Sequence, residues 1–542
     1  MGDKMKIKTI VATLITASAA LILAACGNNK QSNNSTSNKV INSEVNAELQ
    51  TLDPSKYSDS SSSEAIQNSY EGLYAFNQKN KPVLAGAEKV SVSKDKKVYT
   101  FALRKNAKWS NGDPVTAQDY VFGWQRTADP KTASPNTSRF AFIANGEKVS
   151  KGDVKPSQLG VKALGKYKLQ VTLQQPIAYI DELLTGIPFF PQDSKLVQKY
   201  GKAYGTSSAK AVYNGPFTVN GWTGSDLNWT YKKNKYYWNK SAVKLNQVNM
   251  QVVKTPNTAI NLYRESKLDY VPLSGNFIKQ YQNNKNFHKQ LTPMIGYFGF
   301  NTKRKTTGNV HVRRAIGMAV DKKLLVKNVI YAGAPLNGIV PANFAFNTAT
   351  GSDYRKDAGD MLPYDVTKAR AEWKQAQKTL GKKITIELLT SDTDESKLVG
   401  EFLQSNLMKN LPGLTIKLRS IPLKSRLAST TAYNFDVVYG TWSPDFADPV
   451  NFIADGGSYH LSTDYKNSKY EQDLADAAGK YATDPKKRWD ALIDAEKQVV
   501  QKDAFMVPVY QGGQAYLLSS RVKNFQISPY GGIVFYKNAE LK

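Results

Sequence analysis

The spacing of hydrophobic and polar positions changes near residue 300. Before that point apolar residues mostly alternate with polar ones, which is typical of half-buried strands. Strands are expected over 40–45, 90–92, 98–103, 166–173, 217–219, 229–232 and 248–252. Helices are expected over 65–74 and 180–184. A third helix is expected to begin after the N-cap residue Thr116, with Asp119 as the capping-box acid, and to end before Pro130. The first 300 residues are therefore predicted to be rich in strands, with helices between them.

Beyond residue 300 helical and strand periods take turns. Helices are expected over 312–330, 365–380, 396–411, 470–481 and 489–502, and strands over 384–389, 414–421, 435–439, 506–510 and 515–518. Asp365 is placed to cap the second helix, and Gly381 follows it as a C′ glycine. This β-α-β alternation predicts a parallel or mixed α/β sheet.

The first 39 residues do not fit a globular domain. Three lysines precede an apolar stretch over 10–25, which ends in Leu23-Ala24-Ala25-Cys26, and an Asn/Ser-rich tail follows. This order is typical of a secretory signal, and the stretch is too short for a membrane span. The end of the stretch resembles a bacterial lipobox. That resemblance implies a signal peptide over 1–25, a diacylated Cys26 and a flexible tether over 26–39; a plain secretory signal with an accidental cysteine is the alternative.

Composition narrows the class of protein without deciding its function. The chain has 542 residues, of which 41% are hydrophobic and 22% charged, as in ordinary globular proteins. With a single cysteine, no intramolecular disulfide is possible. The net charge of +28 is spread along the chain, and the densest short run is Lys303-Arg304-Lys305. Nucleic-acid binders usually concentrate their charge, so we interpret it as adaptation to an anionic cell envelope and expect no nucleic-acid partner.

Motifs for catalysis are weak. The three histidines, His288, His311 and His460, are far apart and have no cysteine partner, so neither a metal nor a cofactor is expected. The run 160–166 imitates a phosphate loop, but Tyr167 stands where Ser or Thr would hold Mg²⁺, so a hairpin turn is expected. Acidic pairs such as Asp445 and Asp448 are common in loops. The chain is therefore expected to bind a ligand and not to be an enzyme.

Motifs spread over the whole mature length resemble the oligopeptide-binding lipoproteins of ABC importers, the extracellular solute-binding proteins of family 5. The matching runs are Glu88-Lys89, 93–95, 99–104, 107–117, 119–126, Asp129-Pro130, Glu44 with Leu52-Asp53-Pro54, 132–135, 214–217, Tyr237-Trp238, 312–316 and 435–442. The resemblance implies an α/β, periplasmic-binding-protein-like fold (type II, cluster C): a two-lobe clamshell with an extra inserted domain. Lobe I would comprise 40–57, 190–298 and 515–542, the insertion 58–189, and lobe II 299–514.

The resemblance also implies a function. The chain would be the lipid-anchored, monomeric receptor of an ABC transporter on the outer face of the bacterial cell membrane. It would capture extended oligopeptides and pass them to a permease powered by separate ATPase subunits. Relatives with this fold carry other cargo, so an oligosaccharide, a pheromone peptide, haem or a metal complex stays open, as does an envelope hydrolase.

The resemblance also implies which residues form the binding site. Asp445 would bind the free amino group of the peptide, although it would also suit a turn cap beside Pro444. Main-chain bonding and contacts are implied for Glu44, Val45, Asn46, Asn136, Tyr439, Gly440, Thr441, Trp442 and Ser443. Trp442 would equally suit the core. Basic residues that some relatives aim at the peptide carboxyl end are not evident, since Tyr439 and the 392–395 region occupy those places.

Overall fold

The computed structural model describes residues 39–444, 446–454, 465–528 and 531–542. Cys26, Asp445 and His460, about which the sequence made predictions, lie outside these ranges. Lys39–Lys542 form one compact unit built from several separate sheets. Within the described ranges, no helix has both the length and the apolar character needed to cross a membrane.

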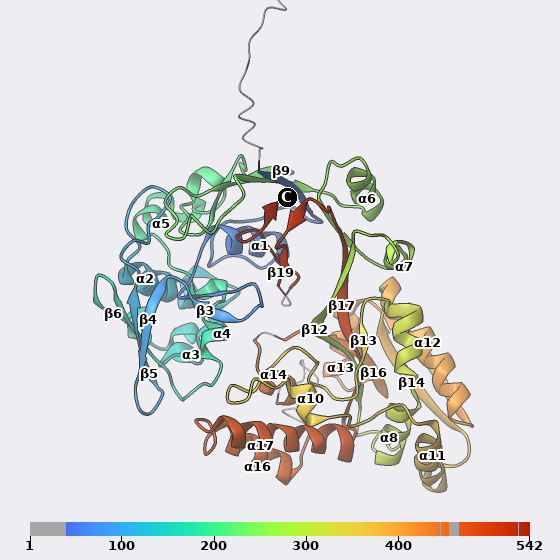
Figure 1. Ribbon diagram of the computed structural model, residues 1–542. Coiled ribbons are helices and arrows are strands. Elements are labelled where there is room, and N and C mark those ends of the chain that lie inside the picture. Colours follow the sequence, from blue (N-terminus) through green and yellow to red (C-terminus); the bar gives the residue numbers. More distant parts are fainter. Residues whose placement is uncertain (1–38, 445, 455–464, 529–530) are drawn as a thin grey trace, which may run out of the picture. The chain divides into compact units, whose positions relative to one another are not determined.

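The first sheet has four strands in the order β1-β10-β9-β8. Their bounds are β1 (Val40–Val45), β8 (Phe217–Asn220), β9 (Asn228–Lys233) and β10 (Gln247–Val252). The β1 strand pairs in parallel with β10 and forms an edge of the sheet, and the other pairs are antiparallel. At the top of Figure 1 this sheet lies beside the C-terminal end of the chain.

A second four-stranded sheet, ordered β4-β5-β7-β6, belongs to the segment between β1 and β8. It consists of β4 (Ala87–Val92), β5 (Val98–Leu103), β6 (Val161–Gly165) and β7 (Lys168–Thr172), all antiparallel. The β6–β7 hairpin turns at Lys166 and Tyr167, which confirms the hairpin predicted in place of a phosphate loop. The short β2 (Tyr74–Phe76) and β3 (Pro82–Leu84) form a separate hairpin.

The largest sheet has seven strands, ordered β11-β17-β12-β16-β14-β15, with β13 paired to β17. Its strands are β11 (Tyr270–Leu273), β12 (Phe287–Phe300), β13 (Ala334–Pro335), β14 (Ile384–Ser391), β15 (Leu414–Ile421), β16 (Val437–Trp442) and β17 (Met506–Leu518). The long β12 and β17 run antiparallel, and their register shifts between Leu291 and Ile295. They form a two-stranded connection between the upper and lower parts of the body (Figure 1). Short ladders of two-residue strands complete the C-terminal end: β18 (Val522–Lys523) with β21 (Glu540–Leu541), and β19 (Gln526–Ile527) with β20 (Val534–Phe535).

Helices fill the connections. They are α1 (Ser60–Ser69), α2 (Ala117–Ala128), α3 (Gly146–Lys151), α4 (Ile180–Leu183), α5 (Ser194–Tyr200), α6 (Pro256–Arg264), α7 (Asn276–Tyr281), α8 (Val310–Ala319), α9 (Lys322–Leu325), α10 (Tyr354–Ala358), α11 (Val366–Leu380), α12 (Asp394–Asn410), α13 (Leu423–Thr431), α14 (Val450–Ile453), α16 (Ser468–Ala478) and α17 (Pro485–Lys497). The capping box of α2 forms as predicted, because the Thr116 N–H donates to Asp119 Oδ2 over 2.6 Å. Helix α11 packs against α8, and α12 packs on β14 and β15.

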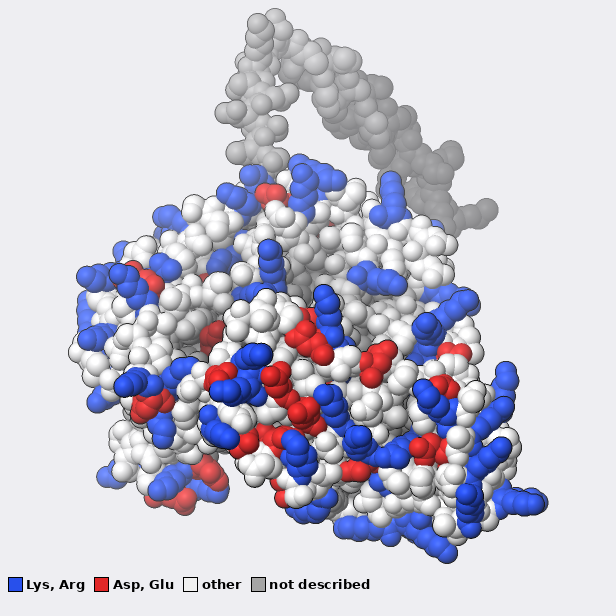
Figure 2. All heavy atoms as spheres, turned by 60° about the horizontal axis from the view of Figure 1, so that its bottom comes forward, with Lys and Arg blue, Asp and Glu red and all other residues white. Residues whose placement is uncertain are grey.

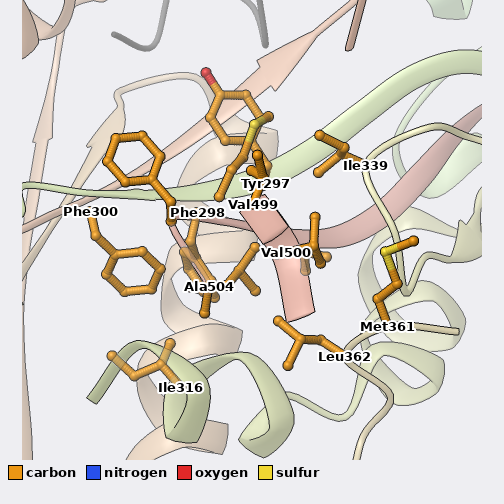
Figure 3. Close-up of a cluster of buried hydrophobic side chains, with 14 of the residues drawn as sticks. Tyr297, Phe298, Phe300, Ile316, Ile339, Met361, Leu362, Val499, Val500 and Ala504 are labelled. Carbon is orange, nitrogen blue, oxygen red and sulfur yellow. The ribbon is translucent and has the colours of Figure 1, made fainter. Parts of the chain in front are cut away.

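Two large cores support these layers, and a smaller buried cluster that includes Val271 and Leu517 lies at β11 and β17. One surrounds the seven-stranded sheet and includes Tyr297, Phe298 and Phe300 of β12, which are at most 4% exposed. Figure 3 shows Val499, Val500 and Ala504 packed beneath this part of β12. The other core lies between the two four-stranded sheets and their helices, where Trp109, Trp124 and Trp222 are at most 1% exposed. Dense packing of this kind holds the ends of β1 and β16 in fixed positions.

Several predicted boundaries were wrong, and local caps explain two of them. Helix α1 begins at Ser60, because Asp59 Oδ1 accepts from the Ser62 N–H (2.8 Å), and it ends before Tyr74, which starts β2. The helix predicted over 312–330 stops at Ala319, and Asp321 caps the next one. Strand β12 was missed because Pro293 and two glycines break its hydrophobic run.

Candidate functional site

Strand β16 has an edge without a strand partner. It pairs with β12 along its whole length, from Val437 opposite Phe300 to Trp442 opposite Ile295. On its other side β14 pairs only with Val437 and Val438. From Tyr439 onward, this side of β16 has no neighbouring strand among the described residues.

The direction of each peptide group along β16 follows from the ladder. The Asn301 N–H donates to the Asp436 carbonyl oxygen over 3.0 Å, which places the Asp436 peptide groups on the β12 side. Because these directions alternate along an antiparallel strand, Gly440 and Trp442 also face β12. Tyr439 and Thr441 face the open side. Thr441 is an exposed residue, and no strand among the described residues pairs with its open side.

Strand β1 is a second edge strand: no strand among the described residues pairs with one of its sides, although β11 packs near that side. Its pairing with β10 continues past its end, where the Val253 N–H donates to the Val45 carbonyl oxygen (2.9 Å). On the opposite side, Asn42 exchanges hydrogen bonds with Asp269: its N–H donates to Asp269 Oδ2 (2.9 Å) and its C=O accepts from the Asp269 N–H (2.8 Å). By the period of two, the peptide groups of Glu44 face the same open side as those of Asn42.

Two buried carboxyl groups lie behind this edge. Glu44 is 5% exposed, and within the described residues its carboxylate forms no ion pair. Burial raises its pKa to about 7. Burial, with a smaller contribution from Glu44, raises the pKa of Glu64 on α1 to about 8, even though Glu64 Oε2 accepts from the Val534 N–H (3.3 Å). Its other oxygen has no hydrogen-bond partner in the described part of the chain. Both carboxyl groups therefore gain protons close to neutral pH.

Arg426 of α13 lies against the open part of β16. Its Nη1 is 3.4 Å from the Tyr439 carbonyl oxygen, and its Nε is buried without a partner among the described residues. Burial lowers the pKa of Arg426, because no carboxylate in the described ranges pairs with it. Gly440 leaves room for this packing: a Cβ there would lie 3.1 Å from the Tyr297 hydroxyl and 3.3 Å from Arg426 Nη1. The arrangement keeps a partly desolvated cation beside an open strand edge.

A cavity of about 1340 Å³ opens between the β2–β3 hairpin and α4 on one side and the 343–351 loop, the 447–449 segment and α17 on the other. Its two walls touch where the Tyr179 ring stacks on Phe446, with centroids 4.3 Å apart and an interplanar angle of 3°. Gln290 and Leu291 of β12 also line it. Burial raises the pKa of Tyr179 to about 12, so this hydroxyl stays neutral at physiological pH.

The cavity wall carries one ion pair and, separately, two carboxyl groups without a cationic partner among the described residues. Arg488 and Asp448 form a two-pronged ion pair with both distances at 2.8 Å. Asp181 and Glu182 have no cationic partner among the described residues, and burial raises the pKa of each, that of Glu182 to about 8. The wall can therefore accept cationic or hydrogen-bonding groups, and the cavity is large enough to hold water beside them.

The structure places the predicted site residues in three groups. Glu44, Val45 and Asn46 lie at the end of β1, whereas Tyr439 to Ser443 lie on and just after β16, in a different sheet. Asn136 precedes a short helical turn, where its Nδ2 donates to the Tyr57 carbonyl oxygen (3.1 Å). None of these described residues lines the 1340 Å³ cavity, and Asp445 is outside the described ranges. Their roles stay predictions.

Sequence reasoning missed the groups whose significance depends on burial. Arg426 stands in the run Leu423-Lys424-Ser425-Arg426-Leu427, which reads as an ordinary exposed helix. Asp181, Glu182 and Glu64 carry no motif either. Only the fold shows that these four side chains are buried away from water without an opposite charge beside them among the described residues. No signal in the sequence therefore identified them.

Comparisons with known proteins agree with this architecture. Residues 79–459 match the sequence model of the bacterial extracellular solute-binding proteins, family 5, middle region. A dipeptide-binding protein of Lactococcus lactis subsp. cremoris is 32% identical over 555 residues, covering 99% of each chain.

Two solved structures are similar in fold. OppA of Listeria monocytogenes bound to peptide is 39% identical, with a TM-score of 0.71 over 94% of this chain and 100% of that one. The murein tripeptide-binding protein MppA in its unliganded open form is 25% identical, with a TM-score of 0.81 over 93% of this chain and 98% of that one. These likenesses confirm the expected α/β two-lobe fold and the expected resemblance.

Proposed function

This chain belongs to the bacterial extracellular solute-binding proteins of family 5. From this premise we propose that it captures extended oligopeptides through their main chain and delivers them to a membrane permease. The observation that carries the proposal is the pair of open strand edges. Thr441 of β16 and Glu44 of β1 both direct peptide groups away from their strand partners.

An extended peptide matches such edges because every residue offers one N–H and one C=O. Adding it as a strand satisfies groups on the protein and the ligand together. Main-chain pairing does not depend on side chains, so peptides of different sequence would bind. The Lactococcus relative is named as a dipeptide-binding protein, and the Listeria structure is described as bound to peptide, which supports this ligand class.

Charged side chains of the protein would set the register of the bound peptide. In this proposal Asp445, two residues after Ser443, binds the free amino group of the ligand. Arg426, on the Tyr439 side of the open edge, binds a carboxylate of the ligand. An unpaired, partly buried guanidinium is costly, and a ligand carboxylate would remove that cost. Support for Arg426 comes from its buried Nε and its missing partner among the described residues.

Side chains of the ligand would occupy the polar cavity and the space around it. Asp181 and Glu182 line this cavity and have no cationic partner among the described residues, so they favour water and cationic or hydrogen-bonding side chains over a purely apolar ligand. Bridging waters would let different side chains share the space, each at a cost of about 0–2 kcal/mol in immobilisation entropy. Asn136 and Trp442 are kept as contact residues in the proposal.

Binding would be followed by hinge closure. We propose lobe I over 40–57, 190–298 and 515–542, the insertion over 58–189, and lobe II over 299–514. The two four-stranded sheets fall within lobe I and the insertion, which supports that part of the division, whereas β12 and β17 of the seven-stranded sheet cross from lobe I to lobe II. Their register shift between Leu291 and Ile295 lies opposite Gln511–Gly513. The higher TM-score to an unliganded open form than to a peptide-bound form supports an open state without ligand.

The anchor and the partners complete the proposal. Removal of the 1–25 signal would leave a diacylated Cys26 that holds a monomeric receptor on the outer face of the cell membrane. ATP hydrolysis would belong to other subunits. The Lactococcus relative and MppA are both named as binding proteins, which supports a receptor over a hydrolase.

Calorimetry with a mixed-sequence peptide library and, separately, an oligosaccharide library tests the ligand class. Heat of binding is expected for peptides alone. Heat with saccharides alone would remove the peptide proposal, and peptide fragments detected by mass spectrometry after incubation would favour the hydrolase. Mass spectrometry of ligands that co-purify from cells would then give their length and sequence tolerance.

A further inference from the structure

Six cations gather at one end of the seven-stranded sheet. Lys303, Arg304 and Lys305 follow β12, Lys378 lies in the last turn of α11, and Lys382 and Lys383 precede β14. All six are exposed. We call this group the distal basic patch. Figure 2 shows Lys and Arg side chains with few acidic neighbours over the lower right of the molecule, the region of α8 and α11 in Figure 1.

Sheet topology brings the patch together from segments about 75 residues apart in sequence. Strand β12 runs antiparallel to β16, which runs parallel to β14. The end of β12 and the start of β14 therefore lie at the same end of the sheet. Two hydrogen bonds fix the connections: Asn309 Nδ2 donates to Thr379 Oγ1 (3.1 Å), and Gln377 Nε2 donates to the Lys382 carbonyl oxygen (2.8 Å).

Little acidic charge compensates the patch. Arg304 lies 3.9 Å from Asp436 Oδ1, and the other oxygen of Asp436 accepts from the Glu387 N–H (2.9 Å). The remaining five cations form no ion pair with any residue that the structure describes. Lys303 is also positioned, with its Nζ 3.3 Å from the centroid of the Tyr433 ring. Unpaired cations held this close together repel one another, and an anionic partner would relieve that repulsion.

The chemistry of the patch selects the kind of partner. Five of its six members are lysines, which bind phosphates as point charges but are depleted in protein–protein interfaces. No exposed large hydrophobic side chain belongs to it. None of the six lines the 1340 Å³ cavity or the smaller cavities of about 400 and 40 Å³. A row of exposed lysines fits a linear polymer that carries one negative charge per unit.

Figure 1 places the region of the patch at the other end of the body from the first described residues. The described chain begins at the edge of the β1-β10-β9-β8 sheet, at the top of Figure 1, whereas α8 and α11 lie at the bottom. We propose that the distal basic patch binds a linear phosphodiester polymer of the cell envelope, a property separate from ligand capture at the strand edges.

The test uses the purified full chain and two probes with the same chemical group. One is linear poly(glycerol phosphate), and the other is vesicles of phosphatidylglycerol. The patch variant carries Lys305→Gln, Lys378→Gln, Lys382→Gln and Lys383→Gln. A matched control carries Lys162→Gln, Lys168→Gln, Lys195→Gln and Lys202→Gln, four exposed lysines elsewhere with the same loss of charge. Thermal unfolding midpoints check that both variants fold. If the patch variant does not fold, the single change Lys382→Glu replaces it in the binding experiment.

The wild-type chain is expected to bind the polymer with an affinity that falls as salt rises. Because each phosphate contact releases counterions, removing four contacts should lower the slope of log affinity against log salt by about 3 and the affinity by at least about tenfold near 50 mM salt. The control should stay within about twofold of wild type. Peptide binding should not change.

Three results would overturn the proposal. If the control loses as much affinity as the patch variant, net charge and not the patch is responsible. If the patch variant binds the polymer like wild type, or the wild type does not bind it, the patch has another role. If vesicles bind more tightly than the polymer through the same lysines, the partner is a bilayer.

Discussion

The guanidinium of Arg426 contacts the strand that carries the open edge, with its Nη1 atom 3.4 Å from the carbonyl oxygen of Tyr439. This contact places a cation at the first β16 residue that β14 leaves unpaired. Because a neighbouring carboxylate is missing among the described residues, Arg426 is a candidate to recognise a negative group on the ligand.

Arg426→Met is expected to weaken peptides with a free carboxyl end or an acidic side chain by at least about tenfold, or ~1.4 kcal/mol. Amidated, uncharged peptides should bind as before. The free energy of unfolding should not fall, since methionine removes a cation that is buried without an opposite charge. Calorimetry of paired acid and amide peptides measures the first effect, and chemical denaturation the second. Lys424→Met, an exposed change on the same helix, is the control; equal losses for acid and amide peptides would contradict the role.

Thr441→Pro tests the main-chain proposal. Proline removes the N–H that faces the open edge, so all peptides should lose affinity alike, by about fivefold or more for one lost hydrogen bond of ~1 kcal/mol or more. Stability should change little, because proline is tolerated where an edge N–H faces away from the sheet.

Gly440→Pro is the matched control for that experiment. Its N–H faces β12, so the same change one residue earlier should lower the free energy of unfolding as well. Denaturant titration and peptide calorimetry separate the two variants. If both positions destabilise the fold equally, or if Thr441→Pro leaves binding intact, peptides do not pair with this edge.

Asp445→Asn is expected to weaken peptides with a free amino end by about 2–5 kcal/mol, because truncating one partner of a desolvated ion pair leaves the other charge unpaired. Acetylated peptides lack the ammonium group and should bind both proteins alike. Calorimetry with each peptide in its free and acetylated form measures the difference. An equal loss for both forms would make Asp445 a structural residue.

Glu64→Gln should change how stability depends on pH. Burial raises the folded-state pKa of Glu64 from 4.5 to about 8, so the folded protein holds a proton that the unfolded chain releases. This proton stabilises the fold below about pH 4.5, and the contribution is lost as pH rises toward 8.

Glutamine stays neutral and keeps an oxygen for the Val534 N–H. The variant should therefore match wild type near pH 5 and exceed its free energy of unfolding by about 2–4 kcal/mol near pH 8. Urea titrations at both pH values provide the measurement. Glu401→Gln, an exposed change on α12, is the control; a constant difference between Glu64→Gln and wild type across this pH range would contradict the assignment.

Several strands and helices of this fold could be predicted from the sequence, because they depend on local hydrophobic alternation and on capping residues. The 40–45 strand was predicted with its final bounds, and the helix begun by Thr116 and Asp119 formed as expected. Strand β12 was not predicted, since Pro293, Gly296 and Gly299 weaken its local signal. Its pairing with β16 and β17, strands more than 130 residues away, stabilises it instead.

For the candidate site, the sequence indicated the two strands through a family resemblance, and the fold decided which of their groups are accessible. Whether Thr441 or Gly440 faces the open edge depends on register, because a shift of one residue reverses every direction along a strand. Alternation, charge and motif are properties of neighbours along the chain, so the amino-acid sequence alone determined many of the elements, the family resemblance and the excess of lysine. Arg426 has no carboxylate partner among the described residues, Glu64 has a raised pKa, and Lys305 lies at the same end of the sheet as Lys382. These three features depend on burial and on distant segments, and only the tertiary structure decided them.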